Sequence, residues 1–290
     1  MWYRADMKRA SFAAYLLLGA VGAAGAMGAG ALAVAAPPAS APADPPTVPS
    51  LSALMEKELH WGMSHTDVTA VYNQLNGLFD REYAPLLAKL QPGTQQQQLE
   101  ADRDNRKANL ERSLTEFLPG SPTGYDVTAL HLEYTYGNGE SVQKLFKDGK
   151  NRYFFYIKDR FWKMYDEVPL RADGPLGASY QEAVTKLNGL FSVPARIRAA
   201  NSASGLERTE ADWVDARSHL RAVDRSGEHI IGIVMVDKNT EMNLPSLRTY
   251  KAADPFALDP SVANITKNGV TDPNAARSVP DAGAKGKGRH

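Results

Sequence analysis

The sequence contains no cysteine among its 290 residues. This absence excludes disulfide bonds, thiolate metal sites, a cysteine nucleophile and a lipid-modified N-terminal cysteine. Charge of one sign is also lacking, because 33 basic residues balance 33 acidic residues. Without a global positive field, a nucleic-acid partner is not expected. The hydrophobic fraction of 43% is still enough to build a core, and the length suits one large or two small domains at ~150 residues each.

Motifs for catalysis and metal binding are equally scarce. The two Gly-x-Ser segments, at 62–64 and 177–179, lack the second glycine of a nucleophile elbow, and no glycine-rich phosphate loop is present. His60 and His65 are five residues apart, a spacing that does not bring both rings to one helical face. We therefore expect no catalytic residue with a recognisable motif, no metal site and no cofactor.

The N-terminus carries a targeting pattern. Three basic residues precede an uncharged stretch of 24 residues at 13–36, so residues 1–36 are predicted to be a signal peptide or an N-terminal membrane anchor. Small residues at 33–35 suit cleavage before Ala36. A secretory apolar region spans ~7–15 residues and a membrane-crossing helix needs ~20, so residues 13–36 are also long enough to remain as a membrane tether. Either outcome predicts an extracytoplasmic protein, whether periplasmic, anchored in the inner membrane or secreted.

Two segments have compositions that disfavour folding. Residues 37–50 are predicted to be a proline-rich linker, because six prolines fall within 37–49. Residues 252–290 contain a single aromatic residue and scattered Pro, Gly, Asp and Asn. Such a segment cannot bury enough apolar surface to offset its ordering entropy, so we expect a disordered tail.

The region between these segments repeats a motif. Leu-Asn-Gly-Leu-Phe occurs at 75–79 and again at 187–191, and each copy follows one of the Gly-x-Ser segments. In both copies the serine is suited to cap a helix, with an acidic residue three positions later to complete a capping box. The Asn-Gly pair is suited to end that helix. We therefore expect each half to begin with a short capped helix.

Strand patterns follow each predicted helix. The fold class is therefore predicted to be α+β, with a first unit at 51–172 that carries a helical insertion at 80–118, and a related second unit at 173–251. Within the insertion, opposite charges four residues apart favour a helix over 94–117. Antiparallel strands are expected at 127–136, 142–146, 152–157 and 161–168, and then at 195–200, 212–214, 219–224 and 228–236, with a closing helix at 239–248.

A Gly-x-Ser opening, an acidic residue and a short helix followed by an antiparallel sheet resemble the SmpA/OmlA-type proteins of the bacterial envelope and the related β-lactamase-inhibitor-like fold. The resemblance covers roughly 60–80 and 175–240, as a tandem copy. It implies a non-enzymatic role in which the sheet or a helix edge binds another protein. The chain departs from this family in two ways, because it has no lipobox cysteine and because the insertion at 80–118 is foreign to the compact pattern.

The hairpin at 152–167 offers a candidate binding surface. A two-residue turn at Asp159-Arg160 would set one face of aromatic residues against the core. The other face would carry the binding residues that we predict, namely Phe154, Tyr156, Lys163 and Tyr165. The inserted helix or the other half of the chain could also cover these rings. If they stay partly exposed instead, they form an aromatic anchor patch.

These patterns favour an exported or membrane-tethered interaction module of the bacterial cell envelope that binds another envelope protein. The alternative is a hydrolase or transferase of envelope polymers with an unrecognised acidic site, for which Asp212, Asp215 and Glu133 are the first suspects. A deep cleft that converges on two carboxylates would favour the enzyme, and a shallow aromatic surface would favour the binding module.

Overall fold

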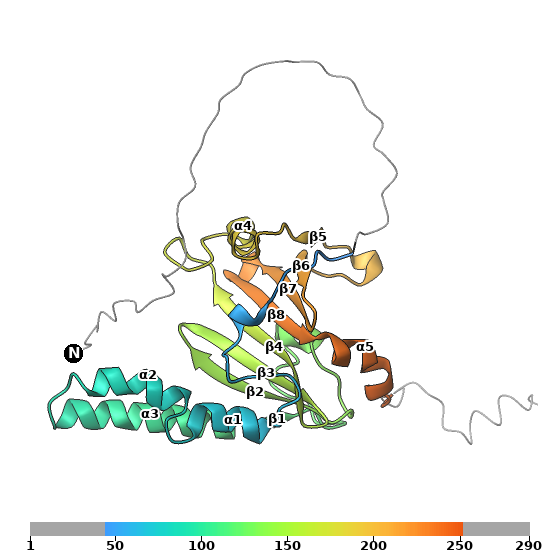
Figure 1. Cartoon of the computed structure of the whole chain (residues 1–290). Helices are drawn as coiled ribbons and strands as arrows, with labels where there is room; N and C mark the ends of the chain where they lie inside the picture. Colours follow the sequence, from blue (N-terminus) through green and yellow to red (C-terminus); the bar gives the residue numbers. More distant parts are fainter. Residues whose placement is uncertain (1–43, 252–290) are drawn as a thin grey trace, which may run out of the picture. The chain divides into compact units, whose positions relative to one another are not determined.

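The computed structural model describes residues 44–251, and its centre is an antiparallel sheet of eight strands (Figure 1). The order of the strands across the sheet is β1-β2-β3-β4-β8-β7-β6-β5. Their bounds are β1 Thr115–Glu116, β2 Glu140–Lys147, β3 Lys150–Ile157, β4 Arg160–Pro169, β5 Arg196–Arg198, β6 Glu210–Val214, β7 Ser218–Arg225 and β8 Ile230–Asp237. The order is symmetric about the β4–β8 pair, which joins the first four strands to the last four. The predicted α+β class is confirmed at this level.

Helices cover one face of the sheet, which we call the helical face. They are α1 His65–Asn73, α2 Leu78–Leu87, α3 Thr94–Arg112 and α4 Tyr180–Phe191, while α5 Lys238–Leu247 follows the last strand. Tyr72 of α1 and Leu187 of α4 belong to the same buried apolar cluster as Phe154 of β3 and Trp213 of β6. The main core therefore lies between the sheet and α1 and α4.

Ser64 and Ser179 cap their helices, as the sequence predicts. Ser64 accepts a hydrogen bond from the backbone N–H of Asp67, whose carboxylate accepts one from the Ser64 N–H in return, so the capping box is complete. Ser179 accepts from the N–H of Glu182 at 3.2 Å, but the Glu182 carboxylate accepts from the Ala178 N–H, so the predicted second capping box does not form. Each cap satisfies a backbone donor that the first helical turn would otherwise leave unpaired.

The ends of the two helices differ, although the sequence there is identical. α1 ends at Asn73, and the first Leu-Asn-Gly forms a turn in which Asn76 has a φ of 60°. In the second copy Asn188 and Gly189 lie inside α4, which ends at Phe191. The prediction that Asn-Gly ends both helices is therefore wrong for α4. There the helix continues for one further turn, which buries Phe191 against Trp213 at 5.4 Å between ring centroids.

The insertion is helical, as predicted, but its second helix ends at Arg112 and not at 117. Polar contacts and two cation–π contacts of Arg106, with Phe79 and Tyr83, hold α3 against α2. Lys107 Nζ lies 2.5 Å from Asp80 Oδ1, and the guanidinium of Arg106 lies 4.7 Å from the centroid of the Phe79 ring. Only Leu110 of α3 is fully buried, so this helix pair depends on charge more than on apolar packing.

The predicted register of the β3–β4 hairpin is wrong. The turn is Lys158-Asp159, both with positive φ, and Tyr156 pairs with Phe161 while Phe155 pairs with Lys163. Trp162 has no partner on β3 and forms a β-bulge, so the pairing between the strands shifts by one residue from Tyr156–Phe161 to Phe155–Lys163. A bulge turns two consecutive side chains to the same side of the sheet. The Lys163 ammonium accordingly lies over the Trp162 ring, 4.4 Å from its centroid.

Two hydrogen bonds to residues outside the hairpin fix this turn. Asp159 Oδ1 accepts a hydrogen bond of 3.0 Å from the backbone N–H of His65, the first residue of α1, and the Lys158 N–H donates to Gly139 at 2.8 Å. Turns with two positive φ values usually carry Asn or Gly, and neither is present at 158–159. The turn position therefore depends on tertiary contacts that the hairpin sequence does not reveal.

The strand expected at 127–136 does not form. Thr128 caps a single helical turn at Ala129–Leu132 by accepting from the N–H of Leu130, and loops flank this turn. The backbone then turns through Gly137 and Gly139, both at positive φ, before β2 begins. This segment covers part of the second face of the sheet, so Leu130 and Tyr134 are buried without strand pairing, whereas Val127 and Leu132 stay exposed.

The proline-rich linker does not stay free along its whole predicted length. Val48 N–H donates to Val214 O at 2.7 Å, and Val214 N–H donates to Pro46 O at 3.0 Å, so residues 46–48 extend the sheet beside β6. Residues 1–36 and 252–290 lie outside the described residues. Within residues 44–251 no helix is both long and apolar enough to cross a bilayer.

Candidate interaction site

The structure buries the predicted aromatic patch. Phe154 and Tyr156 are 0% exposed, Tyr165 is 2% exposed and Lys163 is 3% exposed. They also fail to share a face, because Phe154 and Tyr156 pack toward α1 whereas Tyr165 belongs to the cluster on the opposite face. The prediction of a partly exposed patch is therefore wrong. The bulge turns Lys163 away, and the ring of Tyr72 on α1 covers Phe154 at 5.8 Å.

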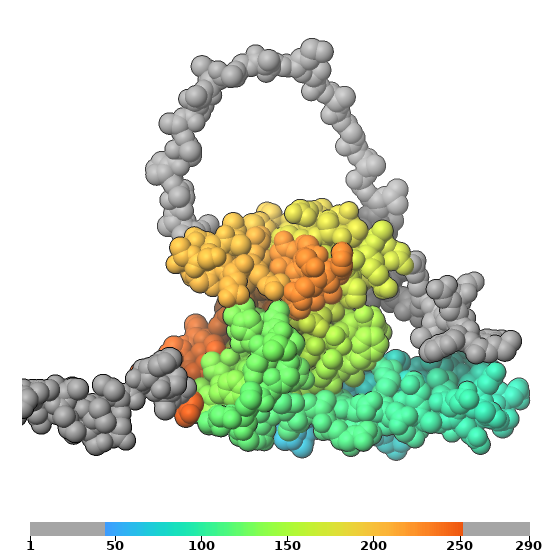
Figure 2. Space-filling view, turned by 180° about the vertical axis from the view of Figure 1, so that it is seen from behind, coloured from blue at the N-terminus to red at the C-terminus, as the bar shows by residue number. Residues whose placement is uncertain are grey.

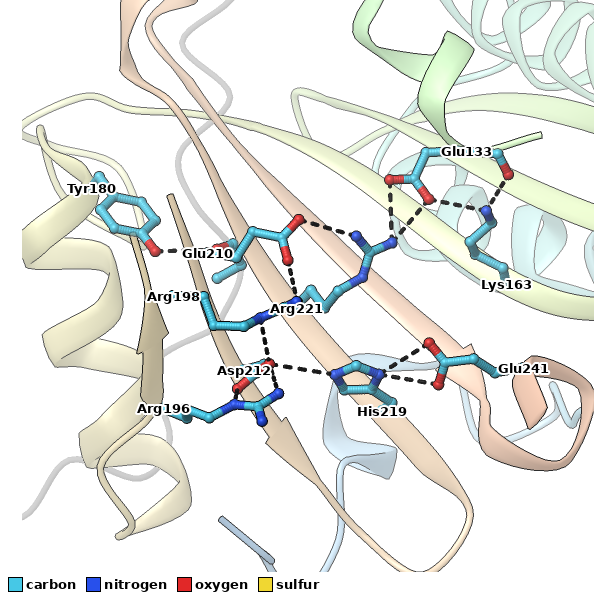
Figure 3. Close-up of polar contacts among 11 residues, drawn as sticks. Glu133, Lys163, Tyr180, Arg196, Arg198, Glu210, Asp212, His219, Arg221 and Glu241 are labelled. Atoms are coloured by element: carbon cyan, nitrogen blue, oxygen red, sulfur yellow. Dashed lines mark hydrogen bonds and ion pairs between the residues drawn. The ribbon is translucent and has the colours of Figure 1, made fainter. Parts of the chain in front are cut away.

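The second face of the sheet has two different parts. Over β2, β3, β4 and β8 it is apolar, and the segment at 117–138 and α5 cover it. Over β5, β6 and β7 it is polar, and we call this part the charged face (Figure 3). Its members come from alternate positions of the three strands and are Arg196, Arg198, Glu210, Asp212, His219 and Arg221.

The period of two in each strand places these groups together. In β6, Ala211 and Trp213 point into the core on the helical face, so Glu210 and Asp212 point to the other face. Arg198 pairs with Glu210 across the β5–β6 ladder, and Arg196 pairs with Asp212. Oppositely charged residues at these paired positions stabilise both ladders.

Glu133 joins the charged face to the segment before β2. Its carboxylate accepts from Arg221 at 3.0 Å and from Lys163 at 2.9 Å, and Lys163 also donates to the Glu133 backbone oxygen. Burial alone would raise the pKa of Glu133, but attraction from Arg221 and Lys163 outweighs it and lowers the pKa to about 2. Glu133 is therefore a fixed anion at physiological pH.

A second series of contacts runs to α5. Asp212 accepts from Arg196 at 2.6 Å, and His219 Nε2 lies 3.7 Å from the same carboxylate. His219 Nδ1 lies 3.1 Å from Glu241 of α5. Burial opposes ionisation of Asp212, but hydrogen bonds and charges from His219, Arg196 and Arg198 lower its pKa to about 2. The charged face thus ties α5 to β6 and β7.

A groove borders this face. One cavity of about 270 Å³ lies between Leu132 and Glu133 on one side and the loop at 205–210 on the other, with Arg221 and Val223 among its lining residues. A second cavity of about 480 Å³ shares Ala129, Arg208 and Arg225 with the first and extends to Asp126. In Figure 2 the segment before β2 (green) lies next to the chain around residue 205 (gold). We call the two cavities together the groove.

The acidic suspects do not converge on a reacting position. Asp215 accepts from the backbone N–H groups of Leu51 and Ser218, at 2.7 and 2.5 Å, and so holds a turn. Glu133 and Glu210 both contact the groove, but the Arg221 guanidinium lies between them and bonds to each. A carboxyl group that donates a proton near neutral pH needs a raised pKa. The pKa of Glu133 moves in the opposite direction.

Sequence reasoning missed the charged face as a unit. The available signal was the spacing of two in Arg196 and Arg198, in Glu210 and Asp212, and in His219 and Arg221. Glu210 lies outside the strand predicted at 212–214, so the second pair was not recognised as part of one strand. Within residues 44–251 no group of His, Asp and Glu is arranged to hold a metal ion. No family model, no curated protein and no solved structure matches the chain.

Proposed function

We propose that this chain is an exported or membrane-tethered binding module of the bacterial cell envelope that captures another envelope protein in the groove on its charged face. The observation that carries the proposal is that the ionised groups of the charged face pair with one another. A saturated network of this kind presents shape and charge for recognition, whereas catalysis needs a group poised to transfer a proton or attack a substrate.

Exposed apolar residues at the groove support this proposal. Leu132 is 52% exposed on the segment before β2, and Leu206 lies across the first cavity from it. A rim of charged groups around a few apolar anchors is the usual composition of a protein-binding surface. The segment between 126 and 133 and the loop at 205–210 together form the walls into which a partner would insert.

We further propose that the chain is a tandem pair of SmpA/OmlA-like units. Three features support this origin: the strand order is symmetric about β4 and β8, each half has a serine-capped helix before its strands, and Gly62 and Gly177 both have a φ of 90° before those caps. The insertion of α2 and α3 would then be an addition to the first unit.

The proposed tether would keep the groove near the membrane. Residues 37–45 lie between the apolar stretch and the residues that pair with β6, and these nine residues reach at most about 30 Å when fully extended. A module held at that distance suits a partner in or on the same membrane. If the signal is cleaved instead, the same groove would act in the periplasm.

Site-specific photo-crosslinking in growing cells tests the proposed function. A photoreactive residue at Leu132, in the groove, should crosslink to a defined envelope protein. The matched control is Leu190 on the outer side of α4, which is 57% exposed and lies on the helical face. Equal crosslinking from both positions, or none from Leu132, would contradict a binding role for the groove.

A further inference from the structure

The groove carries a net negative charge that its internal ion pairs do not remove. Its charged lining consists of six carboxylates and four guanidinium groups, namely Asp126, Glu133, Glu167, Glu207, Glu210 and Glu228 with Arg198, Arg208, Arg221 and Arg225. Lys163 lies behind Glu133 and neutralises part of this charge. One negative charge therefore remains even when Lys163 is counted.

The unneutralised carboxylates lie at identifiable positions. Asp126 accepts from the hydroxyl of Tyr136 at 2.6 and 2.7 Å and from the N–H of Thr123 at 2.8 Å, and it forms no ion pair with any residue in the described range 44–251. Glu207 is exposed and forms no ion pair with any residue from 44 to 251. By contrast, Arg225 neutralises Glu167 at 2.7 Å.

Apolar side chains border these carboxylates. Val127 is 92% exposed beside Asp126 and lines the second cavity, and Leu132 and Leu206 line the first. Exposed aliphatic residues around a groove are typical of anchor positions at binding surfaces. The groove therefore combines apolar contact area with an attraction for positive charge.

From this complementarity we infer that the occupant of the groove is an extended segment of the partner protein in which a large apolar residue lies close to Lys or Arg. The apolar side chain would contact Leu132, Leu206 and Val223, and the cation would lie against Asp126 or Glu207. This inference rests on the proposed function and adds the chemistry of the partner segment.

Selection of binders from a display library of random twelve-residue peptides tests the inference. The bait is the exported form of the chain, purified from the cell envelope. We expect the enriched peptides to pair an apolar residue with Lys or Arg. Their affinity, measured by fluorescence anisotropy, should fall about ten-fold with Leu132→Ser and about five-fold with Glu207→Gln. Leu190→Ser is the matched control and should leave the affinity unchanged.

Glu207 is chosen because it is exposed and unpaired, so its replacement cannot disturb the fold as a change at Asp126 would. Enrichment of acidic peptides, or binding that Leu132→Ser and Leu190→Ser reduce equally, would overturn the inference. Crosslinking from Leu132 to an envelope protein combined with acidic peptides would refute only the charge preference. Absence of the crosslink would refute the proposed function itself.

Discussion

Glu133→Gln is the variant that most directly tests the description of the charged face. The substitution keeps the shape of the side chain but removes the negative charge between Arg221 and Lys163. Lys163 would then remain buried without its counter-charge, whereas Arg221 would keep its ion pair with Glu210. Breaking a buried ion pair from one side is strongly destabilising, typically by ~3–5 kcal/mol.

The pKa of Glu133 gives an independent estimate of the magnitude. Its lowering from 4.5 to about 2 corresponds to about 3 kcal/mol of stability at neutral pH, because each pKa unit is worth ~1.36 kcal/mol. A carboxylate whose pKa falls on folding contributes this stability above its unfolded pKa. The contribution is lost as the pH falls from about 4.5 to about 2.

Urea unfolding followed by tryptophan fluorescence measures the effect. At pH 7 the free energy of unfolding of Glu133→Gln should be lower than that of the wild type by about 3 kcal/mol. At about pH 3 the difference should be clearly smaller. Glu207→Gln removes a carboxylate from the same groove and should change stability by less than about 0.5 kcal/mol.

A double variant separates the lost ion pair from other effects. Lys163→Met combined with Glu133→Gln removes the ammonium that the single change leaves without its counter-charge. The double variant should therefore lose less stability than the sum of the two single variants. A Glu133→Gln cost below about 1 kcal/mol at pH 7, or one that is unchanged at pH 3, would refute the assignment of Glu133 as a stabilising anion.

Three further predictions concern other positions. Ser64→Ala should lower the free energy of unfolding by ~1 kcal/mol in urea titrations, because it removes the cap of α1. Burial alone would lower the pKa of His219, but hydrogen bonds with Asp212 and Glu241 outweigh burial and raise this pKa above 6.5. Protonated His219 therefore contributes stability below about pH 6.5, and this contribution is lost as the pH rises through the pKa of the folded state. His219→Gln should therefore cost more stability at about pH 6 than at about pH 9. Gly232→Ala should destabilise by ~1–3 kcal/mol in the same assay, because a Cβ there would lie 2.6 Å from the Tyr165 hydroxyl.

Local signals predicted the elements of this fold well. The serines at 64 and 179 cap helices, and all four strands expected in the second half begin within two residues of their predicted starts. Each of these features depends on side chains and backbone within a few residues of one another. For that reason a single sequence contains the necessary information.

Features that depend on tertiary contacts could not be predicted in the same way. The register of the β3–β4 hairpin depends on Asp159, whose carboxylate accepts a hydrogen bond from the backbone N–H of His65 at the start of α1. The two residues are 94 positions apart in the sequence. The bulge at Trp162 has no sequence signature, yet it turns Lys163 to the second face. The prediction of the aromatic patch failed because the assumed alternation continued through this bulge.

The same bulge explains how the groove acquires one of its walls. Lys163 reaches Glu133 because Trp162 and Lys163 point to the same side, and Arg221 reaches Glu133 from β7. The segment before β2 is therefore held over the charged face by ion pairs at its end as well as by apolar packing at Leu130. If the groove binds as we propose, Glu133→Gln should weaken peptide binding more than Glu207→Gln does, even in conditions where the variant remains folded. The reason is that loss of the Glu133 charge loosens one wall, whereas loss of the Glu207 charge removes a single contact.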